Sequence, residues 1–229
     1  MSTLGKDHRV TEHAVSAHPH WFDRRALKPL LGLNAAVLEA LVASANASKS
    51  PARLPLAIDL AELLATLSAH ARGRLAQCPF SLIDAGFDDA ERWFLIKTGR
   101  MPKRTEDERH AGFGLKKATS LANMTLTLAW SLARSNQDAA RLILGMSEAC
   151  GGVVADIALA DLPAIAEQYA DLFRPRWEHR PDIWRHLLQL AMQDCERGQP
   201  ALIVWAMEYF LTDLRRGRSL SGQGRTKVE

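Results

Sequence analysis

Alanine and leucine dominate this sequence, contributing 35 and 33 of its 229 residues. Both have high helix propensity, whereas aromatic residues, which favour strands, make up only 7% of the chain. This composition predicts an all-α protein and argues against a β-sandwich, a β-barrel or a dinucleotide-binding sheet. We therefore expect a multi-helix orthogonal bundle.

Capping residues mark where several helices should begin or end. Ser68, Asp88 or Asp89, and Ser147 are predicted N-caps, because their side chains can accept a hydrogen bond from the first helical turn. Gly145 falls where a left-handed residue ends a helix. A long helix is predicted over 115–135, and prolines 163, 181 and 200 mark the starts of later helices.

Asn34 is interpreted as the N-cap of the first clear helix. The small, polar stretch 43–52 ends near Pro51 and is typical of a linker. Gly, Pro and charge content then predict a division into a flexible N-terminal tail (1–22), a first helical repeat (23–99), a linker (100–114), a second helical repeat (115–214) and a disordered basic tail (215–229).

Two stretches of the chain resemble each other. Residues 31–36 and 144–149 both contain a Leu-Gly pair followed by a capped helix, and Trp93 and Trp184 follow in the same order. This alignment places an insertion of 22 residues largely in the linker 43–52. The pattern indicates two pseudo-symmetric helical repeats, although chance similarity in a Leu- and Ala-rich chain stays an alternative.

The second half also resembles a known family. Asn123-Met124-Thr125 begins a helix, Leu144-Gly145-Met146 and Glu148 form a turn, and Asp161-Leu162-Pro163 begins a later helix. In the first half, Cys78, Phe80 and Phe87-Asp88-Asp89 form a related stretch. This order of features is similar to that of the bacterial flagellar transcriptional activator subunit FlhD family.

The resemblance implies an all-helical dimeric or tetrameric regulator that acts on DNA with a partner subunit. The chain is about twice as long as that family's members, so it would hold in one chain what the family assembles from two. The resemblance also raises an intersubunit disulfide at Cys78, while Cys78 beside Pro79 is by itself typical of a buried thiol.

The remaining chemistry-bearing residues favour no enzyme. No G-x-S-x-G, phosphate-binding loop, H-E-x-x-H or C-x-x-C motif is present. His179, His186 and Cys195 could meet in space, but we expect packing or surface roles and neither a metal site nor a cofactor. Three widely spaced cysteines and the absence of an evident targeting or membrane-spanning run indicate a reducing cytoplasm.

Basic residues gather in three places that could contact phosphate. The formal net charge is +3, and the last seventeen residues carry five basic and two acidic side chains. Solubilising surface charge and local ion pairing with Glu178 and Asp182 are the alternatives. The candidate DNA-binding residues are Arg100, Lys103 and Arg104; Arg174, Arg176, Arg180 and Arg185; and Arg215, Arg216 and Arg218.

These observations lead to the hypothesis of a cytoplasmic, non-catalytic bacterial transcriptional regulator. We expect it to act through a partner regulatory subunit and DNA, as a homo- or hetero-oligomer, without a membrane. The alternative is a protein-interaction adaptor that makes no DNA contact.

Overall fold

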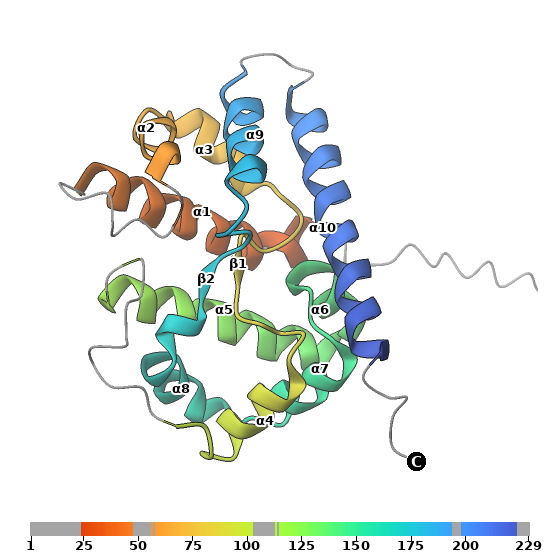
Figure 1. Ribbon diagram of the computed structural model, residues 1–229. Helices are drawn as coiled ribbons and strands as arrows, with labels where there is room; N and C mark the ends of the chain where they lie inside the picture. The colour runs from red at the N-terminus through yellow and green to blue at the C-terminus, as the bar shows by residue number, and fades with distance from the viewer. Residues whose placement is uncertain are drawn as a thin grey trace, which may run out of the picture.

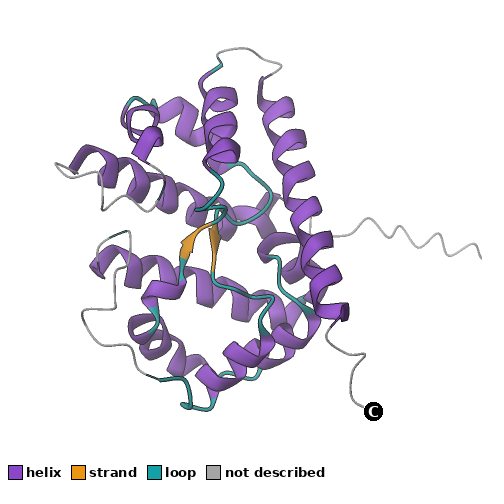
Figure 2. Cartoon of the chain, viewed as in Figure 1, coloured by secondary structure: helices purple, strands orange, loops and turns teal. Residues whose placement is uncertain are grey.

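The computed structural model describes residues 24–47, 56, 58–102, 113, 115–193 and 198–223. Within them the chain is an all-α, multi-helix protein with one short two-stranded ribbon, so the predicted fold class is confirmed (Figure 2). The predicted N-terminal tail and most of the predicted linker 100–114 lie outside the described residues.

The elements follow one another in two similar series. The first comprises α1 (Arg24–Ala47), a 3-10 turn (Ile58–Leu60), α2 (Ala61–Ala65), α3 (Ala69–Ala76), β1 (Ile83–Asp84) and α4 (Ala90–Lys97). The second comprises α5 (Leu115–Ser135), α6 (Gln137–Leu144), α7 (Glu148–Ala155), a 3-10 turn (Leu159–Asp161), α8 (Leu162–Gln168), a further 3-10 turn (Ala170–Leu172), β2 (Arg174–Pro175) and α9 (Pro181–Met192). A last helix, α10, spans Gly198–Gln223.

Local capping signals predicted the helix ends well. The side-chain oxygens of Ser68, Asp89 and Ser147 accept hydrogen bonds from backbone N–H groups three residues later, at 2.9–3.2 Å. Gly145 ends α6 with a φ of +76°, a left-handed conformation that glycine adopts without a steric penalty. These caps depend only on neighbours within one helical turn, which is why the sequence alone identifies them.

Two predicted boundaries are wrong. Helix α1 continues to Ala47, so residues 43–47 are helical and only 48–52 of the predicted linker lie outside the described residues. Helix α10 continues beyond Leu214 to Gln223, so the prediction of disorder from residue 215 is wrong as far as 223, and 224–229 lie outside the description.

Asn34 lies inside α1 and is fully buried, so its prediction as an N-cap is also wrong. Its amide nitrogen donates to the carbonyl oxygens of Cys78 and Phe80 at 3.1 and 3.0 Å and is 3.4 Å from that of Ala76. Its amide oxygen accepts from the backbone N–H of Leu82 at 2.9 Å. One side chain thus satisfies several backbone groups of the segment that leads into β1.

The two series repeat with a nearly constant spacing. The long helices α1 and α5 begin 91 residues apart, at Arg24 and Leu115. The strands β1 and β2 also begin 91 residues apart, and so do the helices α4 and α9. The fully buried Trp93 and Trp184 are also 91 apart. Other helix boundaries depart from this spacing by a few residues: α2 and α7 end 90 residues apart, and α3 and α8 begin 93 residues apart.

The two series are called the first and the second copy, and the helices that carry Trp93 (α4) and Trp184 (α9) are called the tryptophan helices. Each copy packs its tryptophan helix against the other copy. Helix α1 packs against α2 and α3, and its counterpart α5 packs against α7 and α8. Helix α4, from the first copy, packs against α7, whereas α9, from the second, packs against α3 (Figure 1). The ribbon joins the copies in antiparallel register, with Ile83 opposite Pro175 and Asp84 opposite Arg174.

The structure therefore supports two related halves but corrects how the sequence aligned them. Gly32, which was matched with Gly145, lies within α1 and ends no helix. The counterpart of α1 is α5, not α7, and the 22-residue insertion is not needed. The match of Trp93 with Trp184 is consistent with the observed register.

Helix α1 is also the longest apolar segment of the described chain. Residues 27–47 have a mean hydropathy of 1.5 and the length of a membrane span, contrary to the sequence-based expectation that no run qualifies. The bent pair formed by α7 and residues 159–168 would qualify only as one broken span. Helix α1 packs against α2, α3 and α5 at the junction of the two copies, a position that a core helix also occupies.

Candidate functional site

A cleft of about 580 Å³ opens beside the strand ribbon. Because β1 and β2 come from different copies, both copies contribute to its walls. Two of the predicted basic residues lie here, together with others that the sequence did not single out. The cleft is lined by Asp84, Gly86, Arg92, Met101, Leu172, Arg174, Pro175, Trp177, Glu178, His179 and Arg180.

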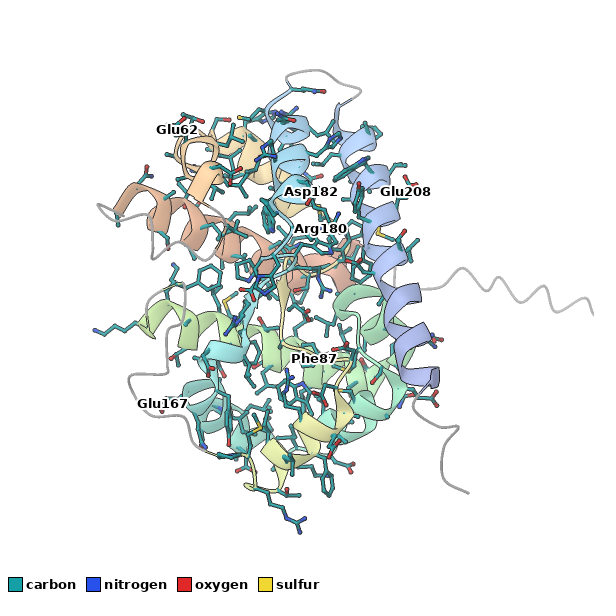
Figure 3. The ribbon with its side chains drawn as sticks, viewed as in Figure 1. Glu62, Phe87, Glu167, Arg180, Asp182 and Glu208 are labelled. Carbon is teal, nitrogen blue, oxygen red and sulfur yellow. The ribbon has the colours of Figure 1, made fainter. Side chains whose placement is uncertain are left out.

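Two of the predicted arginines line this cleft, and each is bound to an acidic neighbour. Arg174 donates to Glu178 at 3.0 Å and to the carbonyl oxygen of Asp171 at 3.0 Å. Arg180 donates two hydrogen bonds to Asp182, at 3.0 and 2.8 Å, and the two side chains lie together in Figure 3. The hydrogen bond from Arg180 lowers the pKa of Asp182 and raises that of Arg180 itself.

Arg176 is buried, so its prediction as a DNA contact is wrong. Its guanidinium donates to the carbonyl oxygens of Ser81 at 2.7 Å and Leu144 at 2.9 Å. It also lies over the ring of Phe210, 5.0 Å from the centroid. These contacts join the segment before β1, the end of α6 and α10, which makes Arg176 a structural residue of the core.

The other predicted cations are distributed around the molecule. Arg185 forms an exposed ion pair with Asp59, linking α9 to the first copy. Arg100 is exposed and directly precedes Met101, which lines the cleft. Lys103 and Arg104 lie outside the described residues, and Arg215, Arg216 and Arg218 lie on the last turns of α10, where the description covers the backbone alone.

Arg92 and Trp177 are site residues that the sequence analysis missed. Arg92 pairs with Asp89 at 3.1 Å, and its guanidinium occupies the space above Gly86, where a Cβ atom would lie 2.8 Å from Nη1. Trp177 has a φ of +57° and donates its indole N–H to Asp213. Gly86, with a φ of +61°, precedes it by 91 residues, and only the correct repeat register could have revealed this pairing.

The thiols and imidazoles offer no catalytic arrangement in the described residues. Burial raises the pKa of Cys78 to about 12, and burial followed by the charges of Asp88 and Asp89 raises that of Cys150 to about 12. Both thiols are therefore protonated at neutral pH and are poor nucleophiles. His179 lies 3.2 Å from Glu178, and His186 stacks on Trp205.

No group of three or more His, Cys, Asp or Glu side chains within the described ranges is arranged to hold a metal ion. Cys195 lies outside these ranges. The cleft offers a mixed set of charges, because three arginines and one histidine line it beside two carboxylates. Comparison with protein-family models, curated proteins and solved structures finds no match to this chain.

Proposed function

We propose that this chain is a non-catalytic bacterial transcriptional regulator of the flagellar activator type. It acts in the cytoplasm through a partner protein and contacts DNA through basic segments. The partner and the DNA together form the functional complex, and no cofactor takes part.

The observation that carries this proposal is the duplication within one chain. Helices α4 and α9 are exchanged between two similar halves across an antiparallel ribbon, as subunits exchange an element in a domain-swapped dimer. The resemblance to the FlhD family implies an assembly of identical subunits. A chain of twice the length, with two copies related in this way, is consistent with such an assembly fused into one polypeptide.

Pairing and burial argue against the Arg174–Arg185 group as the DNA contact, which leaves the basic segments 97–104 and 215–218 as the candidates; in the first of these, Lys97 is itself paired with Asp156 at 3.0 Å. Arg176 is buried, and Arg174, Arg180 and Arg185 each face a carboxylate, which offsets their charge. Arg100 is exposed at the start of one segment. Contacts from such residues reach phosphates and therefore give affinity without sequence preference.

An adaptor that makes no DNA contact is the second candidate. The ion pairs Arg174–Glu178 and Arg180–Asp182 favour it, because they leave the cleft with mixed charge rather than a uniform positive field. A mixed surface of this kind suits a protein partner.

A salt titration separates the two candidates. The full chain is mixed with random duplex DNA in a gel-shift assay, alone and with its co-purified partner. We expect retardation at low salt that weakens steeply as salt rises. Replacing Arg100, Lys103, Arg104, Arg215, Arg216 and Arg218 by Gln should reduce binding to all sequences alike.

The matched control replaces Lys28 and Arg141, which lie on α1 and α6, by Gln. This control should bind DNA as the wild type does, after correction for its smaller change in charge. Absence of any shift at tens of micromolar protein, with and without the partner, would contradict DNA binding and leave the adaptor.

A further inference from the structure

Helix α10 covers one flank of the molecule, where α9 is the helix that it packs against most (Figure 1). Over residues 200–214, where its side chains are described, three are fully buried, namely Leu202, Ala206 and Phe210. These three lie four residues apart and form one narrow stripe. By contrast, α9 buries five of its 12 residues. An element with so few buried side chains opens at a lower free energy than the core on which it lies.

One turn of α10 makes its specific contacts with the body. Phe210 stacks on Phe80 with ring centroids 4.7 Å apart, and the same ring lies 5.0 Å from the guanidinium of Arg176. Asp213, three residues later, accepts the indole N–H of Trp177. Phe80, Arg176 and Trp177 are called the α10 seat. Phe80 belongs to the first copy and the other two to the second, so both copies form the seat.

Contacts within the body hold the α10 seat in place. The guanidinium of Arg176 donates to the carbonyl oxygens of Ser81 at 2.7 Å and Leu144 at 2.9 Å. The carbonyl oxygen of Phe80 accepts from the amide of Asn34 at 3.0 Å. These partners all lie outside α10, so the seat keeps these hydrogen bonds when α10 leaves it.

Water readily replaces what α10 supplies to the seat. The indole of Trp177 and the carboxylate of Asp213 each exchange the other for water, at a small net cost. The guanidinium of Arg176 gains hydration, which offsets part of the cost of exposing aromatic rings. Nearer its start, α10 is held to α9 by the stack of the exposed His186 on Trp205, with centroids 4.0 Å apart.

We propose that α10 is a detachable strap, which leaves the α10 seat as a unit while both copies stay folded. The free seat takes back a helix with the same spacing of an aromatic residue and a carboxylate. In the docked state the strap therefore blocks the seat against any other helix of this pattern. The basic residues 215, 216 and 218 lie on the same helix and move with it. Neither DNA nor a partner protein is needed for this movement.

Hydrogen exchange of the full chain, followed by mass spectrometry, tests whether α10 opens by itself. We expect the amides of residues 202–214 to exchange at least tenfold faster than those of residues 121–133 in α5. Phe210→Ala should accelerate exchange in α10 at least tenfold further and change exchange in α5 by less than twofold. Glu208→Ala is the matched control, because Glu208 is exposed on the same helix (Figure 3), and should change exchange in α10 by less than twofold.

Equal acceleration of α10 and α5 by Phe210→Ala would overturn the proposal, because α10 would then open only when the whole chain unfolds. Unchanged exchange in α10 would overturn it as well, because the ring of Phe210 would not hold the helix. Since these measurements contain no DNA, a negative gel shift leaves their outcome unaffected.

A fluorescent peptide with the sequence of residues 200–214 tests whether the free seat accepts a helix. Measured by anisotropy, it should bind the full chain carrying Phe210→Ala saturably. It should bind the wild-type chain at least tenfold more weakly, because the tethered α10 competes at a high effective concentration. The same peptide carrying Phe210→Ala should bind neither chain.

Asp213→Ala in the chain is a second, milder variant, expected to bind the peptide about threefold more tightly than the wild type does. Circular dichroism checks that each variant chain remains folded. Absence of binding to both variant chains, or equal binding by the variants and the wild type, would overturn the proposal.

Discussion

The two halves of this protein meet the same structural requirements with different residues. Where the chain turns from the ribbon into the tryptophan helix, it needs a left-handed residue, which is Gly86 in the first copy and Trp177 in the second. Both copies bury one tryptophan completely, yet Trp184 donates its indole N–H to the carbonyl oxygen of Arg176 at 2.7 Å. The indole N–H of Trp93 has no partner in the described part of the chain.

The two halves also differ in the residues that precede each tryptophan helix. In the second copy, Arg176 and Trp177 contact Phe210 and Asp213 of α10, whereas the first copy carries Ala85 and Gly86 at the equivalent positions. The two copies therefore share the order and spacing of their elements, but their buried polar residues differ. Paired substitutions at equivalent positions measure that divergence directly.

The largest difference should appear at the centre of the two long helices. Asn34 and Thr125 are equivalent and both fully buried, but Asn34 serves the backbone leading into β1 while Thr125 donates only to Leu121 of its own helix, at 2.7 Å. Asn34→Ala should lower the free energy of unfolding by about 3–5 kcal/mol, because several buried backbone groups lose their partner. Thr125→Val should cost less than about 1 kcal/mol.

Urea unfolding followed by circular dichroism measures both free energies. Equal costs for the two variants would show that Asn34 does not support the segment before β1. A fall in the denaturant slope for Asn34→Ala would instead indicate that the first copy unfolds separately.

The two tryptophans should differ next. Trp184→Phe loses a buried hydrogen bond as well as ring volume, whereas Trp93→Phe loses ring volume alone and removes an unsatisfied N–H. We expect Trp184→Phe to be more destabilising by about 1–2 kcal/mol in the same unfolding assay. The opposite order would mean that the N–H of Trp93 finds a partner in solution.

The left-handed turn gives a smaller effect. Gly86→Ala should cost about 1–2 kcal/mol, because an L-residue is strained at a φ of +61° and the guanidinium of Arg92 must move. Gly73→Ala is the control, since Gly73 lies within α3 with nothing near its Cβ position, and it should stabilise by up to about 1 kcal/mol. Thermal melting of both variants shows whether the two changes have opposite signs.

The smallest effect concerns pH at the starts of the tryptophan helices. Arg180 lowers the pKa of Asp182, so the ionised carboxylate adds stability above its unfolded pKa, and this stability is lost as the pH falls through the folded pKa. Asp182→Asn should therefore flatten the loss of stability on the acid side of about pH 4. Because the pair is exposed, the change should be slight.

Glu91 precedes Asp182 by 91 residues, and Glu91→Gln is the matched control. Urea midpoints between pH 7 and pH 3 compare the two variants. Identical acid profiles for Asp182→Asn and the wild type would show that the Arg180–Asp182 pair adds nothing to stability in solution.

The candidate site was predictable only in part. Arg174 and Arg180 were identified as basic residues near a helix start, and both line the cleft. Arg176 lies two residues after Arg174, and the sequence alone does not distinguish the two, but the side chain of Arg176 is buried. Its acceptors, Ser81 and Leu144, lie 95 and 32 residues away and give no local signal.

The sequence by itself determined the helical class and most helix ends, because helix propensity and capping depend on residues within a turn of one another. The tertiary structure decided what Asn34 and Arg176 do, which helix belongs to which half and where the cleft opens. These depend on groups brought together across tens of residues, and a short polar side chain has the same local pattern whether it caps its own helix or satisfies a distant backbone.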